Sequence, residues 1–191
     1  DTSSLQNLGG GGAPVQPDLV HKIEERAEGR PATGYGLTEV NGVVTINAGH
    51  FFLAKPESAG SPCPIMESRI VDEDGHDLLV GETGELWVRG GNVFRGYLNH
   101  PEANAEVLTD GWFHTGDIGY FDDDGFLFLV DRAKDMVLRG GENVYSAEVE
   151  AAVYEHPAVA EAAVFAVPDD RLGEAVGVAV VLLDGDFCTA D

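Results

Sequence analysis

The chain has 191 residues and is strongly acidic: 34 aspartates and glutamates against 11 lysines and arginines give a formal net charge of −23. Such a surface repels the backbone of nucleic acids and anionic lipid, so neither is expected as a partner. Hydrophobic residues make up 43% of the chain, which is enough for a sizeable core. No run approaches the roughly 20 apolar residues that a membrane span requires.

The two cysteines, Cys63 and Cys188, form neither a disulfide framework nor a metal-binding spacing. This pattern indicates free thiols in a reducing compartment and predicts a cytoplasmic protein. The chain begins with Asp1 instead of methionine, and we expect it to be part of a longer protein.

Residues 1–14 are rich in serine and glycine, which is typical of a flexible linker. Apolar residues spaced four apart then predict a helix over 16–28, ended by Gly29 and Pro31. The residues on its inner face are Val15, Leu19, Ile23 and Ala27.

Residues 62–125 show the features of a β-rich region. Alternating side chains predict strands at 66–71 and 85–89. A short helix is expected over 101–107, because proline suits the first turn of a helix. The acidic run Asp122–Asp124, followed by glycine and flanked by apolar residues, predicts a hairpin with a solvated turn.

The pattern changes after Asp131. The sequence here predicts a small α+β unit. Its elements are a short strand at 136–138, a loop at 139–143, a helix over 146–155 and strands at 159–167 and 176–183. The predicted fold class is therefore α+β. We expect a domain boundary at residues 132–135, between residues 1–131 and residues 136–191.

The run Gly34-Tyr35-Gly36-Leu37-Thr38-Glu39 carries the groups that can hold a nucleotide. Tyr35 offers a ring to stack on a base, Thr38 an oxygen to meet a phosphate, and Glu39 a carboxylate for Mg²⁺. Glycine lets the backbone approach a ligand closely. An ordinary Gly-Tyr-Gly turn is the alternative interpretation.

Five segments in this order resemble the AMP-forming adenylating enzymes, which include acyl-CoA and aryl-CoA synthetases, luciferases and the adenylation domains of peptide synthetases. The segments are Gly11-Gly12-Ala13-Pro14; Gly34 to Glu39; Gly84-Glu85-Leu86-Trp87-Val88-Arg89-Gly90 with Gly96-Tyr97; Gly111-Trp112-Phe113-His114-Thr115-Gly116-Asp117; and Asp131-Arg132-Ala133-Lys134-Asp135 leading into Gly140-Gly141-Glu142-Asn143-Val144. The last segment is more similar to acyl-CoA synthetases than to peptide-synthetase domains.

The resemblance implies a ligase of fatty-acid and lipid metabolism. A carboxylic acid attacks the α-phosphate of ATP to give an acyl-adenylate and pyrophosphate, and the thiol of coenzyme A then displaces AMP. The substrate is expected to be a medium or long aliphatic acid, or a steroid-like or aromatic one. Asn41 to Val44 would border the acyl pocket, and Mg²⁺ would accompany ATP.

The resemblance implies that residues 1–131 are the β-rich end of a large domain, residues 132–135 a hinge and residues 136–191 part of a small domain. It also assigns site residues, most of them with an alternative. In the large domain, Gly11, Gly12 and Ala13 would lie along the adenine, and Tyr35 would stack on it. Gly36 would also contact the nucleotide. Thr38 would meet the α-phosphate, Glu39 would bind Mg²⁺, and Asp117 would accept the ribose hydroxyls. Arg132 would hold ribose or phosphate oxygens, Lys134 would be the hinge, and Gly140 and Gly141 would lie beside the pantetheine arm of coenzyme A. The alternatives are a linker for the first glycines, a core tyrosine, a turn-capping aspartate, a surface ion pair for Arg132, a solvated lysine and an ordinary glycine turn.

Two parts of the family pattern are missing from these 191 residues: the Ser/Thr/Gly-rich phosphate loop before Gly11 and the lysine near the C-terminal end. Both help to stabilise charge during adenylation, so we expect this polypeptide alone to be inactive. An adenylation domain that loads a carrier protein, and a non-catalytic nucleotide-binding or interaction module, are the other hypotheses.

Overall fold

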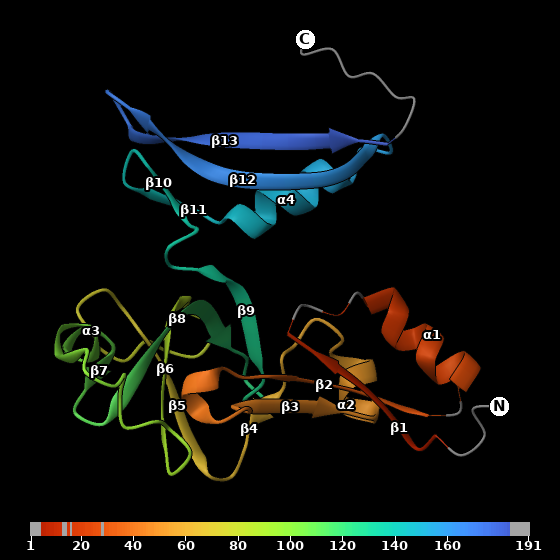
Figure 1. The fold of residues 1–191 in the computed structure, drawn as a ribbon. Helices are drawn as coiled ribbons and strands as arrows, with labels where there is room; N and C mark the ends of the chain where they lie inside the picture. Colours follow the sequence, from red (N-terminus) through yellow and green to blue (C-terminus); the bar gives the residue numbers. More distant parts are fainter. Residues whose placement is uncertain (1–4, 13–14, 16, 28, 184–191) are drawn as a thin grey trace. The chain divides into compact units, whose positions relative to one another are not determined.

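The computed structural model describes residues 5–12, 15, 17–27 and 29–183 (Figure 1). They form two compact units, with the division between Leu129 and Val130. The expected hinge, residues 132–135, lies just inside the second unit. Ala13 and Cys188, and both expected ends of the 16–28 helix, lie outside the described residues. None of the described helices combines the length and apolar character that crossing a bilayer requires.

The first unit opens with a four-stranded sheet, β1-β2-β3-β4. β1 (Asn7–Gly11) runs parallel to β2 (Arg30–Tyr35), and α1 (Pro17–Ala27) connects them. β3 (Thr45–Ala48) and β4 (Ser61–Pro62) continue the sheet in antiparallel fashion, with α2 (His50–Ala54) between them. The flexible-linker interpretation is therefore wrong for residues 7–11.

The inner face of α1 differs from the predicted one. Val20 is fully buried, whereas Leu19, expected on the inner face, is 51% exposed. The four-residue spacing of apolar side chains is compatible with several neighbouring faces of a helix, and the packing of α1 beside β2 selects the one that carries Val20.

The second sheet of this unit has the order β5-β6-β8-β7, with β9 paired to β8. Its members are β5 (Met66–Val71), β6 (Gly84–Gly90), β7 (Leu108–Thr109), β8 (Trp112–Phe121) and β9 (Leu127–Arg132), and α3 (Pro101–Val107) precedes β7. The predicted strands at 66–71 and 85–89, the helix at 101–107 and the hairpin around Asp122–Asp124 are confirmed.

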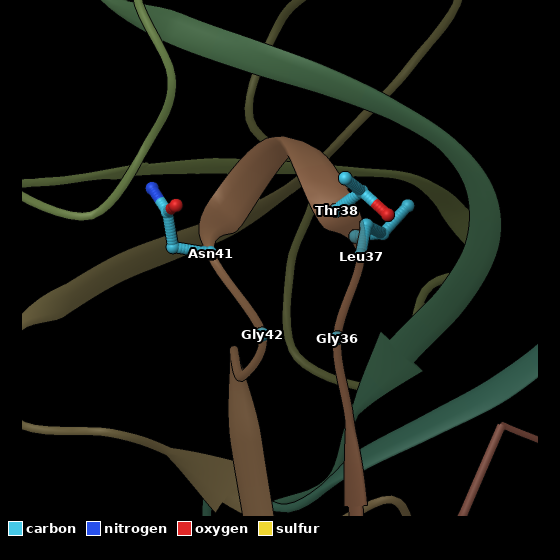
Figure 2. A pocket seen from close by; sticks show the side chains of 5 residues that line it. All are labelled: Gly36, Leu37, Thr38, Asn41 and Gly42. Carbon is cyan, nitrogen blue, oxygen red and sulfur yellow. The ribbon is translucent and has the colours of Figure 1, made fainter.

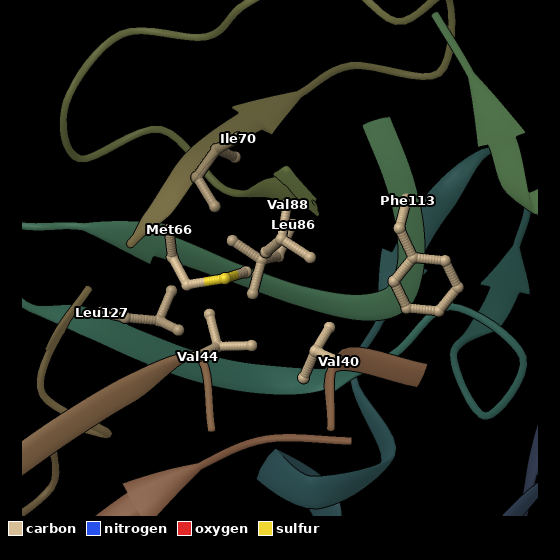
Figure 3. Close-up of a cluster of buried hydrophobic side chains, with 8 residues drawn as sticks. All are labelled: Val40, Val44, Met66, Ile70, Leu86, Val88, Phe113 and Leu127. Atoms are coloured by element: carbon tan, nitrogen blue, oxygen red, sulfur yellow. The ribbon is translucent and has the colours of Figure 1, made fainter. Parts of the chain in front are cut away.

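The core of the first unit joins these strands to the turn after β2 (Figure 3). Its buried side chains are Val40, Val44, Met66, Ile70, Leu86, Val88, Phe113 and Leu127. Burying an aliphatic or aromatic side chain of this kind stabilises a fold by about 1.5–3 kcal/mol. Because Val40 belongs to this cluster, the turn that carries Thr38 and Glu39 is anchored in the core.

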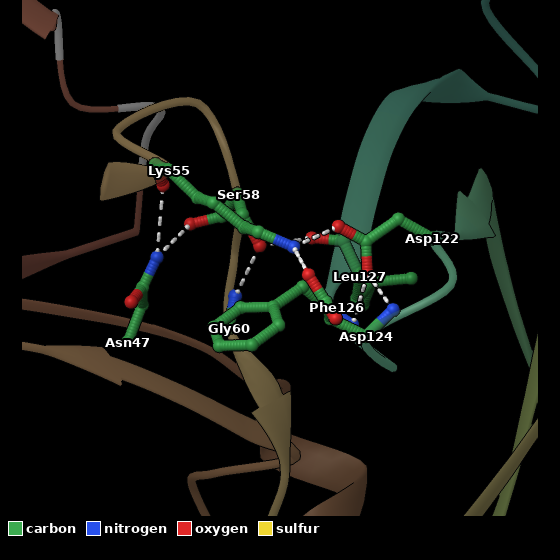
Figure 4. Close-up of polar contacts among 8 residues, drawn as sticks. All are labelled: Asn47, Lys55, Ser58, Gly60, Asp122, Asp124, Phe126 and Leu127. Carbon is green, nitrogen blue, oxygen red and sulfur yellow. Dashed lines mark hydrogen bonds and ion pairs between the residues drawn. The ribbon is translucent and has the colours of Figure 1, made fainter. Parts of the chain in front are cut away.

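A polar cluster connects the segment after α2 with the β8–β9 hairpin (Figure 4). Lys55 binds the carboxylates of Asp122 and Asp124, the latter at 2.7 Å, and its Nζ lies 4.6 Å from the centre of the Phe126 ring. Ser58 adds a hydrogen bond of 2.8 Å from its hydroxyl to the carbonyl of Leu127. The acidic turn is thus not simply solvated, because it holds a lysine.

The second unit is a sheet of order β11-β10-β13-β12 with one helix. It comprises β10 (Val137–Arg139), β11 (Glu142–Val144), α4 (Ser146–Tyr154), β12 (Val159–Asp169) and β13 (Gly173–Leu182). The expected 139–143 loop is shorter than predicted. Only Gly140 and Gly141 separate β10 from β11, with φ of 64° and 89°, as a tight two-residue hairpin turn requires.

Asp131 fixes the beginning of α4. One oxygen of its carboxylate accepts hydrogen bonds from the backbone N–H of Ser146, at 2.5 Å, and from the Ser146 hydroxyl, at 2.8 Å. A helix N-terminus has unpaired N–H groups and a partial positive charge, which a carboxylate satisfies. The segment that precedes the expected hinge is thereby tied to the helix of the second unit.

Candidate functional site

The turn after β2 forms a shallow open pocket lined by Gly36, Leu37, Thr38, Asn41 and Gly42 (Figure 2). Gly34 and Tyr35, expected in a loop, form the end of β2. A 3₁₀ turn, η1 (Thr38–Val40), follows and ends at Asn41, which adopts the left-handed conformation with φ of 53°. Figure 2 shows the two limbs of the turn descending side by side through Gly36 and Gly42.

Gly36 is required by the close approach of these two limbs. A Cβ at this position would lie 1.5 Å from the carbonyl oxygen of Gly42 and 2.6 Å from its carbonyl carbon. No side chain can be placed there unless the backbone moves. Gly36, which the sequence assigns to nucleotide binding, therefore has a structural reason to be glycine.

Tyr35 and Asp117, two of the expected nucleotide-binding residues, are in contact. The Tyr35 hydroxyl donates to Asp117 Oδ2 at 2.5 Å. Asp117 lies in β8 and is 7% exposed. Its backbone N–H donates to the Thr115 hydroxyl at 3.1 Å, and that hydroxyl donates to the carbonyl of Leu86 at 2.7 Å. Asp117 is thus positioned by neighbouring strands, as a binding carboxylate needs to be.

The glycines expected along the adenine lie beside the same turn. Gly11, the last residue of β1, is paired in register with Gly34, and Gly12 follows with φ of 85°. The structure therefore brings Gly11 next to the β2 end that carries Tyr35.

Thr38 and Glu39 are presented by η1. The Thr38 side chain is exposed, and Glu39 is half-buried. Glu39 Oε1 accepts a hydrogen bond of 2.8 Å from the Tyr97 hydroxyl. Burial, followed by this hydrogen bond to Glu39, raises the pKa of Tyr97 above its ordinary value of 10.0, so the phenol stays protonated at neutral pH. The second carboxylate oxygen of Glu39 makes no hydrogen bond within the described part of the chain.

This donor set fits Mg²⁺. The ion binds proteins through one or two carboxylates and completes its shell with water and substrate phosphates. Glu39 supplies a half-buried carboxylate, and Thr38, the preceding residue of the same turn, supplies an exposed hydroxyl.

The remaining expected residues belong to the second unit. Arg132 ends β9 and Lys134 follows in a turn in which the N–H groups of Asp135 and Met136 both donate to the carbonyl of Arg132, at 3.0 and 3.1 Å. Both side chains are exposed. Gly140 and Gly141 form the hairpin turn described above, so the glycine-turn alternative describes their conformation.

Two supporting residues had no role in the sequence interpretation: Asn92 and Asn104. Asn92 lies after β6 and donates to the carbonyl of Val40 at 2.8 Å, and Asn104 in α3 binds the backbone of Tyr97. Their partners lie 52 and seven residues away along the chain. The nearest signal in the sequence is the position of Tyr97 in a segment that resembles the family.

Family models, curated proteins and solved structures all give matches to this chain. The model of the AMP-binding enzyme family matches residues 1–98, and that of the AMP-binding enzyme C-terminal domain matches residues 148–191. Feruloyl-CoA synthase from Amycolatopsis sp. is 45% identical over 192 residues, covering 100% of this chain and 39% of that protein. Long-chain-fatty-acid–CoA ligase from Yersinia pestis is 46% identical over 187 residues, covering 98% of this chain and 33% of that protein.

Among solved structures, o-succinylbenzoate CoA synthetase from Bacillus subtilis, in complex with its acyl-adenylate intermediate, has a TM-score of 0.85 and 36% identity. The match covers 94% of this chain and 37% of that one. The chain thus spans between a third and two fifths of the length of the curated relatives it matches. With a family model matched over more than half of its residues, the chain belongs to the AMP-binding enzyme family.

Proposed function

We propose that this chain carries the nucleotide-binding end of the large domain, and the beginning of the small domain, of a cytoplasmic AMP-forming acyl-CoA synthetase. The observation that carries the proposal is the hydrogen bond between Tyr35 and Asp117, beside the turn of Thr38 and Glu39. It joins the ring expected to stack on adenine to the carboxylate expected to bind the ribose.

In the first step, an oxygen of the substrate carboxylate attacks the α-phosphorus of ATP, and the bond to pyrophosphate breaks. Tyr35 would stack on the adenine, with Gly11 and Gly12 beside it. Asp117 would accept the ribose hydroxyls; an ionised carboxylate has about four lone-pair sites, so it can accept from Tyr35 and from the ribose together.

Thr38 and Glu39 would face the phosphates in this step. The Thr38 hydroxyl would donate to the α-phosphate, and Glu39 would hold the metal that accompanies ATP. Mg²⁺, when bound, supplies positive charge that stabilises the phosphate oxygens as the bond to pyrophosphate breaks. Placing donors and charge in advance at developing negative charge is a large part of catalysis in such sites.

In the second step, the thiolate of coenzyme A attacks the acyl carbon and AMP leaves with the oxygen that joined it to the acyl group. The residues proposed for this step are in the second unit. Lys134 would be the point about which the small domain reorients, Arg132 would bind ribose or phosphate oxygens, and Gly140 and Gly141 would lie along the pantetheine arm.

For the substrate, we propose a hydrophobic carboxylic acid. The two curated relatives are named for an aromatic acid and for long-chain fatty acids. Asn41 and Gly42, which line the pocket beside Thr38, would border the acyl group.

Oxygen transfer tests the proposed reaction. The complete enzyme containing this chain is incubated with ATP, Mg²⁺, coenzyme A and a carboxylic acid labelled with ¹⁸O, in two series, ferulate-like aromatic acids and long-chain fatty acids. The proposal expects ¹⁸O in AMP and a thioester with one of the two series. Three results would overturn the proposal. Label in inorganic phosphate would indicate an acyl-phosphate route, and label in AMP that appears only with a carrier protein would indicate the carrier-loading alternative. An absence of turnover would favour a non-catalytic module.

A further inference from the structure

We propose that Tyr97 is a positioning residue that orients the Glu39 carboxylate toward the metal–nucleotide complex. The inference rests on the proposed function, because it takes Glu39 as the metal ligand. Its basis is the 2.8 Å hydrogen bond from the Tyr97 hydroxyl to Glu39 Oε1, which joins residues 58 positions apart.

The Tyr97 ring is held by aromatic packing that leads to the core. It contacts the Phe94 ring edge to face, with centroids 4.9 Å apart and an interplanar angle of 71°. Phe94 in turn contacts Phe113 in the same manner at 5.5 Å, and Phe113 is 3% exposed. Such contacts restrict the orientation of the ring, and with it the position of the hydroxyl.

The backbone of Tyr97 is held by Asn104 of α3. The Asn104 Oδ1 atom accepts the Tyr97 N–H at 2.6 Å, and its Nδ2 donates to the Tyr97 carbonyl at 2.9 Å. Gly96 makes this approach possible, because a Cβ there would lie 2.8 Å from Asn104 Oδ1, and its φ is 128°. An asparagine that bonds both backbone groups of one residue fixes that residue more firmly than either bond alone.

The same segment holds the backbone of the turn that carries Glu39. The Phe94 N–H donates to the Glu39 carbonyl at 2.7 Å. Asn92 donates to the Val40 carbonyl at 2.8 Å, and Asn41 donates to the Asn92 carbonyl at 2.8 Å. The turn and the segment 92–97 therefore form one hydrogen-bonded body, in which Tyr97 supplies the only hydrogen bond to the Glu39 side chain among the described residues.

A hydrogen bond to one carboxylate oxygen has a specific consequence for metal binding. It removes rotational freedom from a long, flexible side chain before the ligand arrives, and it leaves the other oxygen available as a ligand atom. Groups around a metal site that orient its ligands in this way are often worth 10–100-fold in metal affinity.

The inference is tested by calorimetry of ATP binding to the complete enzyme. One titration contains Mg²⁺, and the other contains a chelator in place of Mg²⁺. The ratio of the two dissociation constants measures how much the metal assists binding. Tyr97→Phe removes only the hydroxyl; it should leave the metal-free affinity unchanged and lower the metal assistance about tenfold. Glu39→Gln should abolish the assistance, and the double variant should lose no more than Glu39→Gln alone. Tyr120→Phe, a tyrosine whose ring stacks on Phe128 at 5.2 Å, is the matched control and should keep the full assistance.

The outcomes separate this inference from the proposed function. A wild-type enzyme that binds no ATP contradicts the proposed function itself. If the wild type binds ATP with metal assistance but Tyr97→Phe retains that assistance, or loses affinity equally with and without metal, Tyr97 does not position Glu39. Metal assistance that survives Glu39→Gln would also overturn the inference, because the metal ligand would then lie elsewhere.

Discussion

The Tyr35 hydroxyl donates a hydrogen bond of 2.5 Å to Asp117, and the two residues are separated by 82 positions in the chain. The bond joins β8 to the end of β2, which leads into the turn that presents Thr38 and Glu39. A nucleoside has a flat base and a ribose diol, and the pair offers an aromatic ring for the one and a carboxylate for the other.

The contribution of the Tyr35 ring can be separated from that of its hydroxyl. Tyr35→Phe keeps the ring, and we expect AMP affinity in the complete enzyme to fall by less than about threefold. Tyr35→Leu removes the aromatic face, and affinity should fall at least about tenfold, because stacking on a base is worth about 1–3 kcal/mol. Calorimetric titration with AMP measures the affinity of each variant. Equal affinity in the two variants would mean that the ring does not stack on the base.

Gly36 is expected to tolerate no side chain. Gly36→Ala places a Cβ 1.5 Å from the Gly42 carbonyl oxygen, so the free energy of unfolding should fall by about 3 kcal/mol or more. Gly10→Ala in β1 is the control, because nothing lies within 4 Å of its Cβ position, and it should change stability by less than about 1 kcal/mol. Urea denaturation measures the free energy of unfolding of the wild type and of both variants. If the two variants were equally stable, the close approach of the two limbs would not exist in solution.

The Lys55 cluster predicts a pH-dependent stability. Burial alone would raise the pKa of Asp122, but hydrogen bonds from Lys55 and from the Phe126 N–H outweigh it and hold the pKa below the ordinary 3.8. A lowered carboxyl pKa stabilises the fold above 3.8, and this contribution is lost as the pH falls through the folded-state value. Lys55→Met should therefore lower the melting temperature at neutral pH, and the difference from wild type should shrink as the pH falls below 3.8.

At alkaline pH, the stabilising contribution of Lys55 is lost as the pH rises instead of as it falls. Hydrogen bonds from Lys55 to Asp122 and Asp124 raise the pKa of Lys55 above 10.5, so its contribution persists below 10.5 and is lost at higher pH. Melting curves of the wild type and of Lys55→Met, recorded from neutral pH to below pH 3.8, test whether the difference in melting temperature shrinks in acid. A difference between them that stays constant through pH 3.8 would show that the cluster is not ionic in solution.

The hinge proposal concerns Lys134. Proline fixes φ near −65° and restricts Ala133 as well, so Lys134→Pro should block one of the two domain orientations. We expect adenylate formation to survive while thioester formation from preformed acyl-adenylate falls about a hundredfold, about 2.7 kcal/mol in barrier. Lys134→Ala keeps the backbone free and should spare both steps. Single-turnover assays of each step distinguish the outcomes: equal loss in both indicates misfolding, and no loss places the hinge elsewhere.

Elements with strong local signals could be predicted from the sequence. The helix that starts at Pro101, the strands β5 and β6, and the hairpin around Asp122–Asp124 depend on alternation, proline and turn residues that are read within a few positions. β1 and β2 could not be predicted in this way. Their glycines and small polar residues have low strand propensity, and parallel pairing across the α1 connection determines their conformation.

The sequence named candidate site residues but gave no sign of the contacts between them. Tyr35, Glu39 and Asp117 stand in recognisable segments, whereas the hydrogen bonds Tyr35–Asp117 and Tyr97–Glu39 join residues 82 and 58 positions apart. Such pairs depend on how the two sheets of the first unit pack, and no local pattern specifies that packing. The structural need for glycine at position 36 likewise becomes visible only when Gly42 lies opposite.

The most direct test of the central claim is the ATP dependence of pyrophosphate exchange in the complete enzyme with and without Asp117→Asn. This change preserves size but removes the charge, and a hydrogen bond to a charged group is worth about 1.5–3 kcal/mol. The account predicts that the KM for ATP rises about tenfold or more, while the KM for the carboxylic acid in the same exchange assay stays within about twofold. An unchanged KM for ATP would contradict it and would make Asp117 a carboxylate that serves only to hold Tyr35.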